Sequence, residues 1–181
     1  IPNTILLTYL FIYMKNLLIV SILLSVFGCA SSSSSIVDSE VLKNQTIDLT
    51  KNALSEYIVF GNVGLGWGCR TSGLYLYAGD QLYADTTNAY CKNAENYRFQ
   101  GYKLGATEKA KAEQIVQKIK NHLSTIKDDG QAIQTIGCPG CADGGMLYVQ
   151  FKTSQSLKAW RLDDMIDSHH KLIVEVATIK R

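Results

Sequence analysis

Residues 57–85 have the sequence YIVFGNVGLGWGCRTSGLYLYAGDQLYAD, which contains two alternating runs, at residues 63–68 and 74–78. In the first half, Tyr57–Cys69, the pattern includes Val63, Leu65 and Trp67, each separated from the next by a glycine. A period of two is typical of a β-strand, whose successive side chains point to opposite faces of a sheet. We therefore expect the folded domain to begin with β-structure.

The second half, Gly73–Asp85, predicts a β-hairpin with its turn at residues 78–81. Tyr75 and Tyr77 alternate there with apolar side chains. Tyrosine has an apolar ring and a polar hydroxyl, so a row of tyrosines on an exposed sheet could recognise an envelope protein or a glycan. Tyr75 and Tyr77 are therefore candidate binding residues, and an ordinary amphipathic sheet is the alternative. Other tyrosines expected to share this surface are Tyr83, Tyr90, Tyr97 and Tyr102.

The rest of the chain predicts further strands and two helices. Apolar residues at helical spacing predict a helix over Thr107–Lys127, with Thr107 as its N-cap. Leu162–Ile179 fits a second helix, although residues 171–179 could instead form an edge strand. Strands are expected at residues 97–104, 132–136, 146–152 and 157–162. This order predicts an α+β fold in which one or two helices pack on one face of an antiparallel sheet.

The N-terminal segment has the organisation of a bacterial export signal. Met14-Lys15 provides a positive start, and residues 17–24 form a short apolar run. The residues that follow, Val26-Phe27-Gly28-Cys29, resemble the lipobox of bacterial lipoproteins. This resemblance implies that Cys29 receives a diacylglyceryl group and that the chain is cut just before it.

We therefore predict a signal peptide over residues 1–28, with residues 1–13 as an extension upstream of a start at Met14. The alternative is an uncleaved membrane anchor, since residues 1–28 could span a bilayer. Lys15 counts against it, because a charge at the centre of a membrane helix costs about 2.5–3.5 kcal/mol.

The residues after Cys29 predict a tether followed by one domain. Ser31–Ser35 is a serine run, which is flexible and cannot form a core. We assign residues 29–55 to the tether, in which 36–55 could include a short helix, and residues 56–181 to a globular domain. The lipoprotein resemblance implies a bacterial cell-envelope location, with the lipid on Cys29 holding the chain to a membrane. Ala30 at the next position, in place of the Asp that retains lipoproteins at the inner membrane, favours the outer membrane.

Charge gives no support for nucleic-acid binding. The 181-residue chain has a net charge of +2, and Lys15 is the only charged residue before Cys29. The part from Cys29 onward therefore has 17 Lys and Arg against 16 Asp and Glu. A nucleic-acid-binding protein normally carries a clear excess of basic residues.

Of the five cysteines, four remain once Cys29 is set aside. An even number in an exported domain predicts two disulfides, although sequence alone allows three pairings. We prefer Cys69 with Cys91 and Cys138 with Cys141. A bridge that closes a loop of the 69–91 length stabilises a fold by roughly 3 kcal/mol in the chain-entropy model.

Two further uses of these cysteines remain open. Cys138-Pro139-Gly140-Cys141 could perform thiol–disulfide exchange, but Gly144 and Gly145 would break the helix whose dipole lowers a thiol pKa. Four thiolates could instead bind zinc, although only one pair has the usual two-residue spacing. Adjacent His169 and His170 would point apart on a helix, so we expect no metal there. Motifs of hydrolases, metalloproteases and nucleotide-binding enzymes do not occur, so we expect a non-enzymatic protein without a cofactor.

One more resemblance concerns the order of the predicted elements. The turn and strand at residues 141–149, CADGGMLYV, resemble a segment of small uncharacterised bacterial lipoproteins. Over residues 57–180 the layout is also similar to the emfourin group of metalloprotease inhibitors. This likeness implies an inhibitor-like module as an alternative function, and it transfers no inhibitory residue to this chain.

Overall fold

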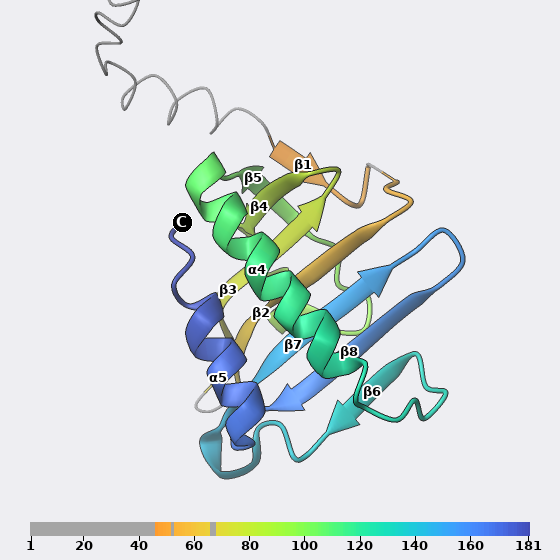
Figure 1. Ribbon diagram of the computed structural model, residues 1–181, viewed down its shortest axis with the longest axis vertical. Helices are drawn as coiled ribbons and strands as arrows, with labels where there is room; N and C mark the ends of the chain where they lie inside the picture. Colours follow the sequence, from red (N-terminus) through yellow and green to blue (C-terminus); the bar gives the residue numbers. More distant parts are fainter. Residues whose placement is uncertain (1–45, 52, 66–67) are drawn as a thin grey trace, which may run out of the picture. The chain divides into compact units, whose positions relative to one another are not determined.

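The computed structural model describes residues 46–51, 53–65 and 68–181 (Figure 1). The predicted signal peptide, the lipobox with Cys29, residues 29–45 of the tether and Trp67 lie outside the described residues. Within the described ranges, none of the helices has both the length and the apolar character needed to cross a membrane.

A single sheet of eight strands forms the centre of the described part of the chain, in the order β1-β5-β4-β3-β2-β7-β8-β6. All neighbouring strands are antiparallel except β6 and β8, which are parallel. The strands are β1 (Thr46–Asp48), β2 (Tyr57–Gly64), β3 (Arg70–Ala78), β4 (Gln81–Asp85), β5 (Gln100–Lys103), β6 (Ile133–Ile136), β7 (Gly145–Lys152) and β8 (Leu157–Asp163).

The prediction of an α+β fold is confirmed, but the predicted layout needs two corrections. The sheet is mixed and not purely antiparallel, because β6 joins its edge parallel to β8. The described residues also contain three α-helices: α3 (Ala89–Lys92), α4 (Ala106–Leu123) and α5 (Asp167–Val176). The direction of β6 depends on where the connection after α4 delivers the chain, which no local pattern specifies.

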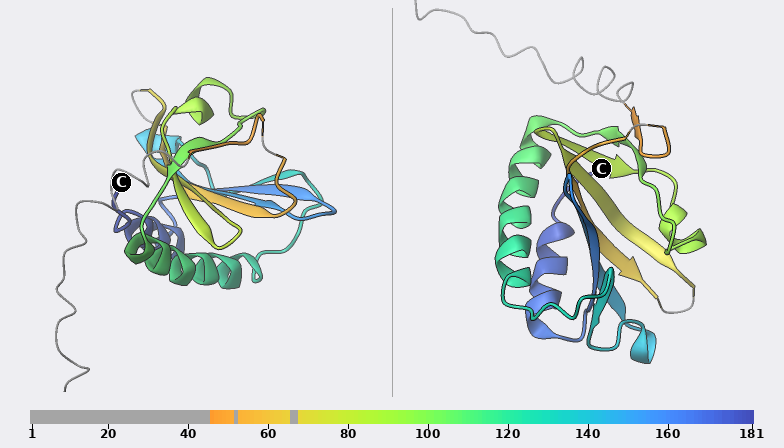
Figure 2. Two further views of the ribbon diagram at one scale, coloured as in Figure 1. Left: turned by 90° about the horizontal axis from the view of Figure 1, so that it is seen from above. Right: turned by 90° about the vertical axis from the view of Figure 1, so that its right-hand side faces the viewer.

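Helices α4 and α5 lie side by side along one face of the sheet (Figures 1 and 2). Their apolar stripes merge with the side chains of that face into one core, which we call the helix-side cluster. Its largest members from the sheet are Ile58, Phe60, Tyr75, Leu82, Leu147, Val149 and Leu162. Lys118 of α4 pairs with Glu175 of α5 at 2.7 Å and ties the two helices together at their surface.

The other face of the sheet has its own core, which we call the opposite-face cluster. Tyr90 from α3 belongs to it, so helical residues pack on both faces and the predicted confinement to one face is not confirmed. Residues 86–99 run over this face between β4 and β5 (Figure 2). The buried members of the cluster are Val59, Val63, Leu74, Leu76, Ala78, Tyr90, Tyr97, Phe99, Met146, Tyr148 and Ala159.

The predicted helices form with shifted ends. The apolar stripe of α4 is buried as expected, but its N-cap is Gly105 and not Thr107, and the helix ends at Leu123. The last stretch is helical in α5 rather than an edge strand, and it begins only at Asp167 because residues 157–163 belong to β8. Residues 46–48, which fall within the predicted tether, form β1 and pair with β5, so the sheet starts earlier in the chain than expected.

The interface between α4 and α5 contains two histidines. The rings of His122 and His169 lie edge to face with their centroids 4.9 Å apart. Nδ1 of His169 lies 2.8 Å from the backbone oxygen of Asp163, while Nε2 of His122 is buried without a hydrogen-bond partner among the described residues. Burial, followed by the proximity of His169, holds the pKa of His122 below its ordinary value of 6.5.

This lowered pKa predicts an acid-sensitive contribution to stability. The unfolded chain binds a proton at His122 more readily than the folded chain does. The free energy of unfolding should therefore decrease as the pH falls below about 6.5. We expect His122→Gln to reduce the fall in melting temperature between pH 7.5 and pH 5, measured by circular dichroism. His170→Gln, which changes an exposed histidine on α5, is the control. An unchanged pH dependence in His122→Gln would show that this group does not contribute.

Candidate functional site

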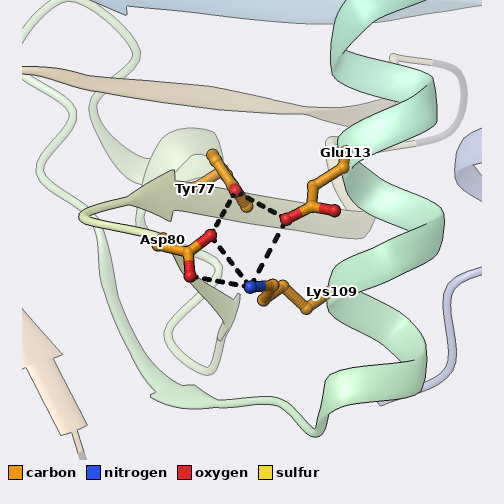
Figure 3. A network of polar contacts seen from close by, with 4 residues as sticks. All are labelled: Tyr77, Asp80, Lys109 and Glu113. Atoms are coloured by element: carbon orange, nitrogen blue, oxygen red, sulfur yellow. Dashed lines mark hydrogen bonds and ion pairs between the residues drawn. The ribbon is translucent and has the colours of Figure 1, made fainter.

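The most conspicuous polar constellation joins the hairpin turn to α4. Figure 3 shows its four side chains, with Tyr77 and Asp80 from the hairpin and Lys109 and Glu113 from α4. Lys109 Nζ donates to both carboxylate oxygens of Asp80 at 2.8 Å and lies 3.4 Å from Glu113. The Tyr77 hydroxyl lies 2.9 Å from Glu113 Oε1 and 3.1 Å from Asp80 Oδ1, so it can donate to either.

The electrostatics of this network favour a structural role. Burial, reinforced by the two neighbouring carboxylates, raises the pKa of Tyr77, which makes it a poor proton donor for chemistry. Hydrogen bonding to Asp80 and the nearby charges raise the pKa of Lys109 and keep it protonated. Each of the four side chains has a partner inside the network, so we interpret it as the contact that docks the hairpin on α4.

The second candidate is a groove on the sheet face opposite α4 and α5. It consists of two adjacent pockets of about 390 Å³ and about 150 Å³ that share Ala94. Small-molecule sites commonly have volumes of about 300–1,000 Å³, so the larger pocket falls within this range. Leu65, Cys69, Tyr90, Cys91, Ala94, Thr135, Pro139, Met146 and Arg161 line the larger pocket. The smaller pocket is lined by Ala94, Glu95, Tyr97, Arg98, Ala132, Ile133, Tyr148, Gln150, Leu157 and Ala159.

Strands β6, β8 and β7 form the floor of this groove. The pairing register places Thr135 opposite Arg161 and Arg161 opposite Tyr148, so these three residues form one row across the strands. Ala159, two residues before Arg161, shares its face, because alternate residues of a strand point to the same side. The small side chain of Ala159 leaves space beside Arg161.

Residues 89–98 form the wall of the groove. Cys91 at the end of α3 lies at disulfide distance from Cys69, with their Cα atoms 5.3 Å apart. The rings of Tyr90 and Tyr148 pack with centroids 4.6 Å apart, which joins the wall to the floor. Tyr97 donates a hydrogen bond of 2.9 Å to Asp85, whose carboxylate is buried at the end of β4. The wall is therefore held by a covalent bridge, ring packing and a buried polar contact.

Arg161 provides the positive charge of the larger pocket. Burial raises the pKa of both Tyr90 and Tyr148, and the charge of Arg161 opposes this rise at both hydroxyls. The guanidinium therefore lies close to the two tyrosines that join wall and floor, and it is hydrogen-bonded to Tyr90. Its Nε is buried and has no hydrogen-bond partner within the part of the chain that the structure describes.

The other cysteine pair flanks Pro139, which lines the same pocket. The Cα atoms of Cys138 and Cys141 are 5.5 Å apart at the two ends of a tight turn, closed by a 3.0 Å hydrogen bond from Cys141 N–H to the Cys138 oxygen. Pro139 precedes Gly140, whose φ of 83° and ψ of 0° define a type II turn that favours glycine. Asp163 Oδ2 accepts a 2.8 Å hydrogen bond from the Cys138 N–H and fixes the turn to β8.

The structure gives a mixed result for the predicted site residues. Both preferred cysteine pairs are brought to disulfide distance. Tyr75, in contrast, is buried with its hydroxyl bonded to the Ile179 oxygen at 2.9 Å, and Tyr77 is engaged with α4. The expected tyrosine surface is therefore not available at Tyr75, because α4 and α5 cover the face on which it lies.

The structure also shows where the two adjacent histidines lie and whether described side chains could form a metal site. His169 is buried and His170 exposed, as the helical spacing predicts. No group of three or more His, Cys, Asp or Glu side chains lies close enough to hold a metal ion in the described ranges. Sequence reasoning missed Arg161, and the only available signal was a charged residue on the same face of β8 as Ala159.

Searches with protein-family models, against curated proteins and against solved structures find no match to this chain. The fold and the groove are therefore the basis for a functional proposal.

The two cysteine pairs should contribute unequally to stability. Cys69 and Cys91 are separated by 22 residues and Cys138 and Cys141 by 3. In the chain-entropy model the double variant Cys69→Ala/Cys91→Ala should lower the unfolding free energy by about 3 kcal/mol, and Cys138→Ala/Cys141→Ala by about 2 kcal/mol. Urea unfolding of the oxidised proteins measures both values. The reverse order would contradict the assignment of Cys69–Cys91 as the main covalent constraint on the groove wall.

Proposed function

We propose that this protein is a lipid-anchored protein of the bacterial cell envelope, without enzymatic activity, whose domain binds a ligand in the groove. The observation that carries this proposal is the larger pocket, which combines a largely apolar lining with one guanidinium whose Nε is buried. Sites that bind small molecules are typically concave and apolar with a few polar groups at fixed positions. The groove has these properties, and its wall is held by the Cys69–Cys91 pair.

Export is supported by two independent features. Val26–Cys29 has the pattern of a lipobox. Four cysteines of the domain lie in two pairs at disulfide distance, and disulfides persist in oxidising compartments outside the cytosol. We propose that the diacylglyceryl group on Cys29 holds the domain at a membrane surface, with Ala30 favouring the outer membrane. The partners of such a domain are the membrane itself and an envelope component, either a protein or a glycan, rather than a nucleic acid.

Thiol–disulfide exchange through Cys138 and Cys141 is the second candidate. Both side chains are exposed, which a redox pair requires. The Asp163 carboxylate bonded to the Cys138 N–H would, however, disfavour a thiolate beside it, and the helical segment at Cys141–Asp143 is only a three-residue 3₁₀ turn. Reduction of insulin by the dithiol form, lost in Cys138→Ser, would favour this candidate over the binding protein. An inhibitor-like module rests on element order only and remains a third proposal.

Lipidation can be tested by the mass of the protein isolated from bacterial membranes. The wild-type chain should begin at Cys29 and carry the mass of a diacylglyceryl group. Cys29→Ser should carry no lipid and should retain residues from Met14 onward, because cleavage follows lipidation. Ser31→Ala, which alters the neighbouring tether, should be processed normally. A wild-type chain that retains its N-terminal segment and carries no lipid would support the uncleaved anchor instead.

Ligand binding in the groove can be tested with methyl NMR. From Cys29 onward the chain has two methionines, of which Met146 lines the larger pocket and Met165 is 71% exposed. The neutral aromatic probe indole should shift the Met146 methyl signal of the lipidated protein in phosphatidylcholine nanodiscs and leave Met165 unchanged. Filling the groove with Ala94→Trp should abolish the shift.

Ala177→Trp, the same change at an exposed position at the end of α5, is the matched control and should keep the response. Equal shifts of both methionines, or a Met146 shift that survives Ala94→Trp, would contradict a binding site in the groove.

A further inference from the structure

We propose that the groove selects a small ligand with one carboxylate and an apolar body, and that Arg161 binds the carboxylate. This inference rests on the proposed function, because it names the ligand class of the same groove. It depends on four observations: the position of Arg161, its buried and unpartnered Nε, the hydrogen bonds of Asp163 to other groups, and the apolar lining of the pocket.

Arg161 occupies the middle of the groove floor. Its neighbours across the strands are Thr135 on β6 and Tyr148 on β7, and its side chain lines the larger pocket. A guanidinium presents a planar fork of N–H donors whose geometry matches the two oxygens of a carboxylate. A ligand in this pocket would therefore meet the charge at its floor and not at its rim.

The guanidinium of Arg161 is hydrogen-bonded to Tyr90, but this contact does not use all of its donors. Its Nε is buried and unpartnered among the residues described, and none of the ion pairs formed between described residues includes Arg161. A buried donor without a partner costs free energy, since it has lost its hydration and gained nothing in return. A ligand acceptor at this position would restore the missing hydrogen bond.

Asp163, the acidic residue on the same face of β8, forms no ion pair with Arg161 among the pairs between described residues. Asp163 accepts a hydrogen bond from the Cys138 N–H at Oδ2 and another from the Met165 N–H at Oδ1, at 2.8 Å and 3.0 Å. Both of its oxygens are therefore committed to backbone donors. The charge of Arg161 remains available for an anion that enters from the groove.

The other lining residues define the rest of the ligand. Leu65, Ala94, Pro139 and Met146 surround the pocket with apolar surface, and Arg161 is its only charged lining residue among those described. One guanidinium matches one anionic group, so a ligand of high charge would leave charges unpaired in apolar surroundings. An apolar or aromatic body with a single carboxylate fits this combination.

The test compares three probes that share a phenyl body and differ in the head group: phenylacetate, 2-phenylethanol and 2-phenylethylamine. Dissociation constants are measured from the Met146 methyl shift of the lipidated protein in phosphatidylcholine nanodiscs, whose lipids carry no net charge. Phenylacetate should bind at least about tenfold more tightly than the alcohol, the ratio expected when one charge-assisted hydrogen bond is gained. The amine should bind more weakly than the alcohol.

Arg161→Met, which keeps the length of the side chain and removes its charge, should abolish the preference for the carboxylate. Arg98→Met, which removes an exposed guanidinium from the neighbouring pocket, should leave the preference intact. If Arg161→Met does not fold, the three probes on the wild-type protein still decide the question.

The outcomes separate the two proposals. Equal binding of phenylacetate and the alcohol, or an equal loss in Arg98→Met and Arg161→Met, overturns the role of Arg161 and leaves the groove as an apolar binding site. If neither the three probes nor indole shifts Met146, the groove proposal fails as well.

Discussion

The burial of β2 on both of its faces is the constraint on which the rest of the fold depends. β2 is hydrogen-bonded to β3 on one side and to β7 on the other, and its adjacent residues Val59 and Phe60 point to opposite faces with no exposed surface. A strand in this position needs a covering layer on each face. Helices α4 and α5 supply one layer, and residues 86–99 supply the other (Figure 2). The second layer is much smaller, so strands β6 and β8 retain an accessible surface, and the groove lies there.

The smaller layer needs support that its own secondary structure cannot supply. Its only helix in the described residues, α3, has four residues, which is far below the length at which a helix is stable by itself. The Cys69–Cys91 pair, the packing of Tyr90 on Tyr148 and the hydrogen bond from Tyr97 to Asp85 hold this segment instead. The same contacts position the groove wall, so the devices that stabilise the fold also shape the candidate site.

Two polar features of the domain, the network around Tyr77 and the side chain of Arg161, show that residue types alone do not distinguish a structural contact from a binding site. Tyr77, Asp80, Lys109 and Glu113 have the residue types of a catalytic site, yet each is paired within the group and the group joins two elements (Figure 3). Arg161 is a single residue, but it lines a pocket and its Nε is a buried donor without a partner among the described residues. Unused hydrogen-bonding capacity beside a cavity is a stronger indication of ligand binding than a cluster of satisfied charges.

Local patterns determined the parts of this protein that depend on neighbours in the chain. The period of two within residues 57–85 predicted the central strands, and the apolar spacing from Ala112 to Leu123 predicted α4. The even cysteine count predicted two disulfides and left three pairings open, of which the preferred one is found at disulfide distance. The parallel direction of β6, the burial of Tyr75 and the position of Arg161 in a pocket were decided by tertiary structure. The direction of β6 depends on where the connection after α4 delivers the chain. For Tyr75 and Arg161, the sequence of a strand marks two faces, but which face is covered, and by what, depends on segments far away in the chain.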